Sequence, residues 1–395
     1  MTRILLLISD LNTGGAERHI SLLAPALRRR GHDVAVYLFG PGRAFADPLH
    51  DAGIPIIDGT VLAQRFRFLP SPARGAMMRA AMVVQLAMHL RRCRYDLHHA
   101  FLPQPCVLLA LAAKLAQVGP VLLSRRSMNN YRDATPWEWK LESRLMRRAD
   151  LVLGNARAIC EQLAEEEGVP RERLVCIPNG VNPQAFLPPA DRAALRRAEN
   201  IADDAVVMVM AASLSARKGH AVLFEALQRA QSRLPENWLL LCAGEGSPDV
   251  ARDLAQRAQC LGGKVRMLGR RADVFALNHL SDIGILCPVH SEGMSNSVQE
   301  GMAAGLPFIV TDVGGNAELV AHGDTGLVVP PGDAAALAEA LVTLAADSAV
   351  RQRLGAAARR FAECEFSLDR CTDRYEQVYR SVLAGDAVPQ ELSCA

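Results

Sequence analysis

No part of the 395-residue sequence contains the ~18 consecutive apolar residues that a membrane-spanning helix requires. The longest apolar stretch, residues 108–123, is interrupted by Lys114, Gly119 and Pro120. The first ten residues hold only a short apolar run, which predicts a buried first strand and not a secretory signal. These absences argue against an integral membrane protein and lead us to expect a cytoplasmic one.

The cysteines and histidines show no metal-ligand spacing. The ten cysteines form no C-x-x-C pair, and the ten histidines form no H-E-x-x-H pattern. Several cysteines lie in apolar runs, as at residues 240–242 and 285–287, which is typical of small buried side chains in a reducing compartment. We therefore expect no metal site and no bound cofactor.

The chain as a whole has almost no excess of charge of one sign, since 44 basic and 42 acidic residues give a net charge of +2. Between residues 61 and 148, however, there are fifteen lysines and arginines but four acidic residues, a net charge of +11. The helix expected at residues 72–92 mixes apolar residues with arginines. Interfacial helices on anionic lipid have this composition, and so do packed helices with solvated arginines. The arginines of the segment include Arg65, Arg67, Arg74, Arg79, Arg91, Arg92, Arg125 and Arg126.

Nucleic acid is not an expected partner of this basic segment. Aromatic residues make up only 5% of the chain, and neither lysine runs nor interleaved aromatic residues occur. An anionic membrane surface is the partner that the segment 61–148 leaves open.

Short apolar runs alternate with helical patterns along the whole chain, which is typical of parallel sheets covered by helices. In the first half we expect strands at residues 4–9, 33–38, 53–57, 96–100, 121–124 and 151–153, and helices at 16–30, 72–92, 106–117 and 137–148. In the second half we expect strands at 205–211, 238–243, 265–268, 283–287 and 308–311, and helices at 220–231, 249–261, 274–280, 298–304 and 333–347.

The length of the chain predicts two domains of about 150 residues or more. Residues 176–189 are rich in proline and glycine and form the expected junction. A last helix, residues 368–383, carries Tyr375 and Tyr379 on one face, a spacing typical of core packing. In open parallel sheets, ligands bind beyond the carboxyl ends of the strands, so motifs at those ends are the candidates for function.

The most informative motif spans residues 291–307 and holds two glutamates, Glu292 and Glu300, separated by seven residues. It follows a predicted strand that ends at Pro288. Ser297 and Glu300 have the spacing of a capping box, so a helix is expected to begin near Ser297. A strand, a loop and a helix N-terminus in this order suit the binding of a phosphate.

Two further loops follow predicted first strands. Arg217 and Lys218 precede Gly219 at the end of one strand, and adjacent cations in this position suit a diphosphate. Gly14 and Gly15 follow the other strand and allow the backbone to approach a ligand closely. Neither loop has the G-x-G-x-x-G fingerprint, which makes a nicotinamide enzyme a weak alternative.

These motifs resemble the E-x7-E signature of retaining glycosyltransferases with the GT-B fold, of the group 1 or family 4 type. The resemblance covers nearly the whole chain and is strongest at residues 14–18, 217–219 and 292–315. It implies an α/β fold class with two doubly wound Rossmann-like domains that face a central cleft. Residues 1–182 would bind the acceptor, residues 190–365 would bind the nucleotide sugar, and a C-terminal helix at 367–385 would pack back on the first domain.

The resemblance also implies roles for individual residues. Glu292 meets the transferred sugar, Glu300 holds the ribose hydroxyls, and Lys218 with Arg217 binds the diphosphate. Backbone N–H groups come from Gly15, Gly293 and Met294. The remaining positions that we expect to bind substrate are Gly14, His99, Ser213, Gly219, Gly244, Gly269, Arg270, Ser295 and Asn296. Gly314 and Gly315 resemble a Gly-Gly-x-x-Glu loop, in which Glu318 matches the acid.

Two positions depart from the family pattern. The arginine of the Gly-Arg-Leu motif falls on Ser213, and Arg217 is the residue that would substitute for it. In the His-x-His pattern of some relatives, the first histidine matches His99 but the second falls on Phe101.

The expected reaction is the transfer of a sugar from a UDP- or GDP-sugar to a saccharide or a polyprenyl or other lipid-linked acceptor. Configuration would be retained and no metal would be required. The implied setting is polysaccharide or glycolipid synthesis, including lipopolysaccharide, peripheral to the inner face of a bacterial membrane. Two alternatives stay open: a nucleotide-sugar epimerase or hydrolase of the same fold, and a catalytically silent scaffold subunit.

Overall fold

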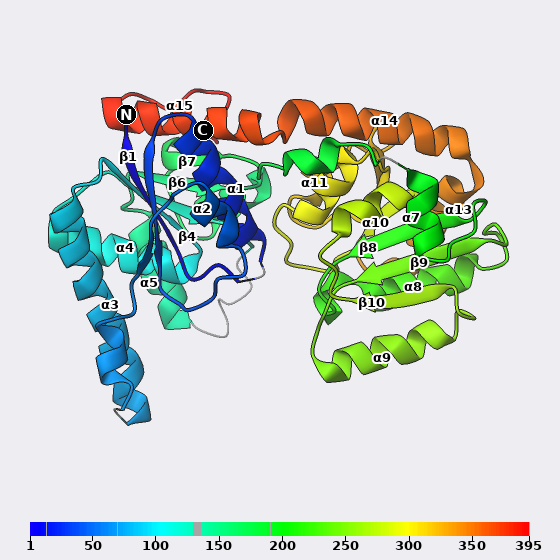
Figure 1. Cartoon of the computed structure of the whole chain (residues 1–395), viewed down its shortest axis with the longest axis horizontal. Helices are drawn as coiled ribbons and strands as arrows, with labels where there is room; N and C mark the ends of the chain where they lie inside the picture. The colour runs from blue at the N-terminus through cyan, green and yellow to red at the C-terminus, as the bar shows by residue number, and fades with distance from the viewer. Residues whose placement is uncertain (13, 69, 129–135, 190, 395) are drawn as a thin grey trace. The chain divides into compact units, whose positions relative to one another are not determined.

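A computed structural model describes residues 1–12, 14–68, 70–128, 136–189 and 191–394, apart from the side chains of residues 71–73, 136 and 137. The chain divides into two compact units. Unit 1 consists of Met1–Gly180 and Leu368–Ala395, and unit 2 of Val181–Ser367. Each unit has its own parallel sheet with helices packed on it (Figure 1).

The sheet of unit 1 has seven strands in the order β3-β2-β1-β4-β5-β6-β7. The strands are β1 (Arg3–Ile8), β2 (Asp33–Leu38), β3 (Ile56–Asp58), β4 (Leu97–Phe101), β5 (Val121–Arg125), β6 (Leu151–Gly154) and β7 (Leu174–Cys176). The helices of this unit are α1 (Gly15–Arg29), α2 (Asp47–Asp51), α3 (Ser71–Cys93), α4 (Pro103–Ala116), α5 (Pro136–Met146), α6 (Arg157–Glu165) and α15 (Leu368–Ala384), with short 3-10 turns at Ala63–Phe66 and Arg171–Arg173.

The sheet of unit 2 has six strands in the order β10-β9-β8-β11-β12-β13. They are β8 (Val206–Ala211), β9 (Trp238–Ala243), β10 (Val265–Gly269), β11 (Ile283–Leu286), β12 (Phe308–Thr311) and β13 (Gly326–Val329). The helices are α7 (Arg192–Ala198), α8 (His220–Ala230), α9 (Pro248–Gln259), α10 (Val274–Leu280), α11 (Asn296–Ala303), α12 (Asn316–Leu319), α13 (Ala334–Ala346) and α14 (Ser348–Glu365), with 3-10 turns at Pro183–Phe186 and Ala216–Lys218.

The central strands, such as β1 and β8, are continuous apolar runs, as is typical of parallel sheets covered by helices. In β1, every residue from Ile4 to Ile8 is fully buried. The pairs between strands of both sheets are parallel. The predicted fold class, two doubly wound α/β domains, is therefore confirmed.

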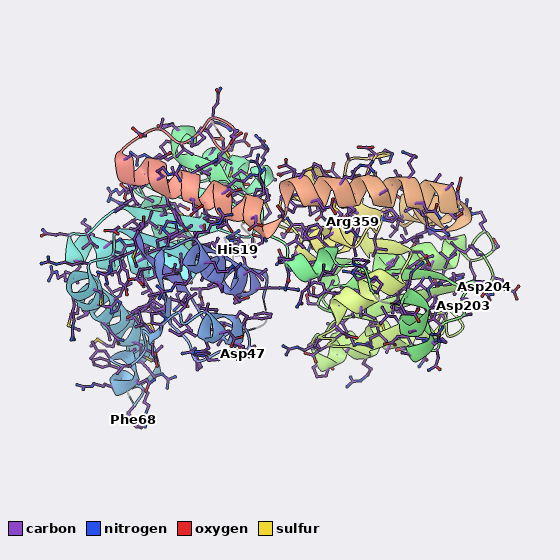
Figure 2. All side chains as sticks on the ribbon, turned by 45° about the horizontal axis from the view of Figure 1, so that its top comes forward. His19, Asp47, Phe68, Asp203, Asp204 and Arg359 are labelled. Atoms are coloured by element: carbon purple, nitrogen blue, oxygen red, sulfur yellow. The ribbon has the colours of Figure 1, made fainter. Side chains whose placement is uncertain are left out.

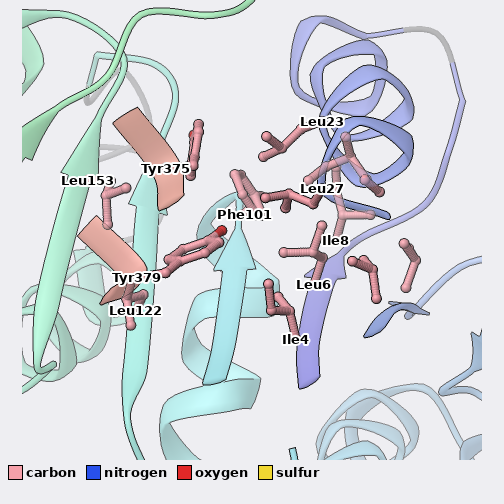
Figure 3. Packing of buried hydrophobic residues seen from close by; sticks show 14 of the residues in the cluster. Ile4, Leu6, Ile8, Leu23, Leu27, Phe101, Leu122, Leu153, Tyr375 and Tyr379 are labelled. Atoms are coloured by element: carbon pink, nitrogen blue, oxygen red, sulfur yellow. The ribbon is translucent and has the colours of Figure 1, made fainter. Parts of the chain in front are cut away.

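The C-terminal helix α15 belongs to the core of unit 1. Its Tyr375 and Tyr379 are buried and reach β4 and β5, as Figure 3 shows for Tyr379 beside Phe101. Arg30 and His32 of the first βα unit bind Glu376 of α15 from the other side. Residues far apart in the sequence thus hold this helix against the first sheet.

Several elements differ from their predicted bounds. Helix α4 begins at Pro103, three residues before its predicted start, because a proline fits the first turn of a helix. The short strands β7 and β13 and the helices α6, α7 and α14 were not predicted. The strand expected at residues 53–57 is β3 and lies one to three residues later. None of the helices in the described part of the chain combines the length and apolar character needed to cross a membrane.

Candidate functional site

In unit 2, the candidate residues lie at the point where the strand order reverses. The chain runs outward from β8 to β9 and β10, then returns to place β11 on the other side of β8. Loops that follow two such strands leave in opposite directions and open a crevice at the carboxyl edge of the sheet. Residues 212–219 follow β8 and residues 287–295 follow β11, so these two loops flank that crevice.

The two loops bring two cations onto one carboxylate. The ammonium nitrogen Nζ of Lys218 lies 2.8 Å from Oε2 of Glu292, and Nη1 of Arg217 lies 3.1 Å from the same oxygen. Arg217 also donates to the carbonyl of Ser291 at 2.6 Å. The side chains of Lys218 and Glu292 are only 13% and 11% exposed. Because charges shielded from water interact more strongly, the two cations attract this carboxylate more strongly than they would at an exposed surface.

Two glycines allow the loops to approach one another. A side chain on Gly219 would place its Cβ 1.8 Å from the carbonyl oxygen of Cys287, and one on Gly314 would collide in the same way with the carbonyl of Glu292. Both glycines also have positive φ angles, 82° and 56°. Gly219, predicted to bind substrate, is thus required by the packing that positions Glu292.

The backbone just before Glu292 is unusual. Ser291 has a φ of 56°, a conformation that residues other than glycine seldom adopt. Its carbonyl is held by Arg217, and the carbonyl of Pro288 accepts a hydrogen bond from Thr311 Oγ1 at 2.6 Å. The neighbouring loops therefore fix the direction in which Glu292 points.

The second glutamate of the motif lies in helix α11. Glu300 is buried, with 4% of its surface exposed, and is the fifth residue of the helix. The predicted capping box is wrong: α11 begins at Asn296 with Ser295 as N-cap, and Ser295 makes no side-chain cap. Ser297 lies inside the helix, where its hydroxyl meets that of Ser295 at 3.1 Å. The helix starts one residue before the predicted Ser297, because Ser295 is the last residue with an extended backbone and so occupies the N-cap position.

The other predicted residues of unit 2 lie along the same sheet edge. Ser213 is exposed in the loop after β8, and the N–H of Gly244, after β9, donates to the carbonyl of Gly269 at 2.8 Å. Gly269 and Arg270 are exposed at the end of β10. Gly293, Met294 and Ser295 are buried between Glu292 and α11, next to the half-buried Asn296.

In unit 1, Gly14 and Gly15 lie where β1 leads into α1. Gly14 is the extended N-cap residue and Gly15 is the exposed first residue of the helix. The carboxylate of Glu17 folds back beside Gly14. Burial raises the pKa of Glu17, and the nearby Asp10 adds to the increase while a backbone hydrogen bond opposes it. The sequence alone assigns no role to Glu17.

His99 does not lie where a substrate could reach it. The side chain is fully buried, Nδ1 is hydrogen-bonded to the hydroxyl of Tyr379 at 2.9 Å, and Nε2 to Ser124 Oγ at 2.8 Å. Burial lowers its pKa well below the usual value, with help from Arg126. The prediction that His99 binds substrate is therefore corrected: in this structure it is a neutral core histidine.

The basic segment also separates into two groups. Arg125 is 1% exposed and forms buried ion pairs with Glu142 at 2.9 Å and Glu167 at 3.2 Å, so it cannot contact a membrane surface. Arg126 is half-buried and donates to Asn179 at 2.5 Å and to the hydroxyl of Tyr375 at 2.7 Å. Arg126 thus places a cation at the carboxyl end of β5. In the sequence it counts only as part of the basic segment.

A buried histidine adjoins the charged cluster of unit 2. His220 opens helix α8 directly after Gly219 and is 1% exposed, and neither ring nitrogen has a hydrogen-bond partner among the residues that the structure describes. Burial lowers its pKa to about 4, and the positive charge of Lys218 contributes. Among the described residues, no group of three or more histidines, cysteines or acidic residues lies close enough to hold a metal ion.

Comparison with known proteins agrees with these features. The family model for glycosyltransferase family 4 matches residues 13–185, and the model for glycosyl transferases group 1 matches residues 205–347. The chain is 27% identical to a glycogen synthase of Mycobacterium tuberculosis, over 95% of this chain and 93% of that protein. It is 28% identical to a phosphatidyl-myo-inositol mannosyltransferase of Mycolicibacterium smegmatis, over 86% of this chain and 83% of that protein.

The same conclusion follows from solved structures. The structure of Anabaena HepE in complex with UDP aligns with a TM-score of 0.82 at 26% identity, over 96% of this chain and all of that one. The same protein has also been solved with UDP-glucose. The chain thus carries a glycosyltransferase family 4 domain followed by a glycosyl transferases group 1 domain, and its two-sheet fold is that of solved GT-B glycosyltransferases.

Proposed function

We propose that this protein transfers a sugar from a UDP- or GDP-sugar to a saccharide or lipid-linked acceptor, with retention at the anomeric carbon and without a metal ion. The observation that carries the proposal is the cluster of Lys218, Arg217 and Glu292 at the strand-order reversal of unit 2. Ligands of doubly wound sheets bind at this point. The complexes of the related Anabaena HepE with UDP and UDP-glucose support a nucleotide sugar as donor.

Each side chain of the cluster has a role in this proposal. Lys218 and Arg217 bind the donor diphosphate, for which the Glu292 carboxylate competes in the described structure. Binding of the diphosphate releases Glu292 to accept hydrogen bonds from hydroxyls of the transferred sugar. Glu300 binds the ribose hydroxyls, and backbone N–H groups of Gly293 and Met294 complete the part of the site that unit 2 supplies.

In the chemical step, the bond between the anomeric carbon and the phosphate oxygen breaks, and a bond to the acceptor oxygen forms on the same face of the sugar. The acceptor proton moves to the leaving phosphate oxygen, so no separate protein base is required. Negative charge on the diphosphate grows as this bond breaks. The two cations lower the barrier because they are already fixed where that charge develops.

The protein is expected to act in the cytoplasm at the inner face of the membrane, in polysaccharide or glycolipid synthesis. Support comes from the exposed arginines of residues 61–94, whereas the buried Arg125 does not contribute. The name of the mannosyltransferase relative, which specifies a phosphatidyl-inositol, is compatible with a lipid-linked acceptor.

The test is calorimetric binding of UDP, GDP, ADP and CMP to the purified full chain in EDTA, followed by product analysis with the matching sugar donor. We expect one nucleoside diphosphate to bind and Glu300→Ala to weaken it strongly. Glu225→Ala, which removes an exposed carboxylate from α8, is the matched control. Unchanged binding in Glu300→Ala would overturn the assignment of the ribose site. Turnover of the donor without an acceptor would favour a hydrolase or epimerase. If no nucleotide binds, the chain would instead be a scaffold subunit.

A further inference from the structure

Unit 1 contains an apolar cavity of about 520 Å³ between helices α3, α4 and α5. Its volume falls within the roughly 300–1,000 Å³ that is usual for small-molecule sites. Val83 of α3, Leu141 of α5, and Val107 and Leu111 of α4 line it, and the polar groups of the lining come from Arg79, Gln104, Glu138 and Glu142. A cavity with such walls is suited to a hydrocarbon chain rather than to a sugar.

The cavity begins at the functional edge of the sheet. Pro103 and Gln104, which line it, are the first two residues of α4 and directly follow β4. They lie at the carboxyl ends of the strands, close to the β1–β4 reversal of strand order. From there the lining continues down α4 to Leu111, two turns further. One end of a ligand in the cavity would thus reach the edge where the acceptor is proposed to bind.

The surface beside the cavity is cationic. Between residues 61 and 95, the sequence has seven arginines, all exposed, and no aspartate or glutamate. These are Arg65, Arg67, Arg74, Arg79, Arg91, Arg92 and Arg94. On the cavity wall, Glu142 is ion-paired with the buried Arg125 at 2.9 Å, and Glu138 is the second carboxylate of the lining. Because the seven exposed arginines outnumber these two carboxylates, the surface around the cavity complements a ligand that is anionic at its polar end.

Exposed apolar side chains accompany these arginines. Met77, Val84 and Met88 of α3 are each more than 40% exposed, and Phe68, just before the helix, is 81% exposed. Figure 2 shows Phe68 at the tip of unit 1 from which α3 begins. Arginines mixed with exposed apolar residues on one helix are typical of a surface that lies at the interface of an anionic membrane.

We propose that this cavity binds the hydrocarbon chain of an anionic lipid-linked acceptor, with the headgroup at the carboxyl edge of the sheet. The proposal rests on the proposed transferase function and deepens it, since it selects a lipid over a free saccharide. The arginines of α3 hold the phosphate-bearing membrane surface, and the chain enters between α3 and α4. The occupant is thus a lipid molecule and not a protein partner.

The experiment measures binding of dioctanoyl phosphatidylglycerol, below its micelle concentration, to the full chain by calorimetry. Leu111→Trp fills the cavity with an indole and is expected to weaken binding about tenfold or more, because excluding even two methylenes from burial reaches that factor. Leu115→Trp, one turn further along α4 and 49% exposed, is the matched control and should bind as the unaltered protein does. Dioctanoyl phosphatidylcholine should bind more weakly than the anionic lipid.

Two results would overturn the proposal: equal lipid binding by Leu111→Trp and Leu115→Trp, or no lipid binding by the unaltered protein. Adsorption to phosphatidylglycerol vesicles that survives Leu111→Trp, without binding of the short-chain lipid, would show surface attachment alone and count against the cavity. Nucleotide binding by Leu111→Trp provides the separate readout. If the unaltered chain binds lipid but no nucleotide, the proposed function fails while the lipid site stands.

Discussion

The two sheets of this protein share an order of strands but differ in what they place at the reversal point. Numbered within each unit, both run 3-2-1-4-5-6, and unit 1 adds a seventh strand. Beside the first strand of unit 2 lie Lys218 and Glu292, charged and paired. Beside β1 of unit 1, within β4, lies His99, which is fully buried and hydrogen-bonded at both nitrogens, and whose pKa is lowered by burial. Topology thus determines where a site can form, and side chains determine whether it does.

The difference has a physical origin in α15. This helix brings Tyr375 and Tyr379 onto the first sheet, into the core that contains Phe101 (Figure 3). The rings of both tyrosines also lie against that of His99. Desolvation then favours the neutral form of any titratable group beneath them. In unit 2, by contrast, one carboxylate oxygen of Glu292, Oε2, lies 2.8 Å from Lys218 Nζ and 3.1 Å from Arg217 Nη1, so opposite charges are paired directly.

The largest effect is expected for Lys218→Ala in unit 2. Loss of one fixed cation at a developing charge costs about 10²–10³ in kcat, and we expect a loss in this range from steady-state kinetics with the matching donor. Arg229→Ala, which removes an exposed arginine of α8, should change kcat little. A loss below tenfold for Lys218→Ala would contradict the role given to this cluster.

A double-mutant cycle shows whether Lys218 acts on the donor or only through Glu292. If Lys218 merely positions Glu292, the double variant Lys218→Ala/Glu292→Gln should be no slower than Glu292→Gln alone. Direct contact with the diphosphate predicts a further loss and weaker binding of the nucleoside diphosphate itself. The comparison uses kcat and calorimetric affinity for the same four proteins.

The sequence predicted the fold class because apolar runs and helical periods alternate in a pattern that suits few other folds. It also placed Glu292, Lys218 and Arg217 at neighbouring loops, since residues at the carboxyl ends of parallel strands meet at one edge. Their direct ion pairs depend on Gly219 and Gly314, whose close contacts arise between loops distant in sequence. His99 was misassigned because Tyr379, which buries it, lies 280 residues away.

For Tyr379→Phe in unit 1, we expect a loss of stability and not of activity. This change leaves Nδ1 of His99 buried without its hydroxyl partner, and an unsatisfied buried polar group costs about 1–3 kcal/mol. A unit of this size should melt roughly 2–4 °C lower per kcal/mol. Differential scanning calorimetry measures the melting temperature, and kcat should stay unchanged. A large fall in kcat with an unaltered melting temperature would instead make His99 part of the reaction.

The smallest effect at neutral pH concerns His220, a buried neutral group beside the charged cluster. Its pKa is lowered to about 4 in the folded protein, first by burial and then by Lys218, against about 6.5 in an unfolded chain. Between these values the unfolded chain binds the extra proton, so folding stability is fully present above about pH 6.5 and is lost as the pH falls towards 4. This residue changes the free energy of unfolding by at most about 1.4 kcal/mol per pH unit.

His220→Leu should remove that part of the pH dependence of the melting temperature of unit 2. In Lys218→Ala the slope should persist over a narrower range, because burial, the larger cause, remains. If the slope instead vanishes in Lys218→Ala, the charge of Lys218 and not burial controls His220, and the histidine would report directly on whatever binds that lysine.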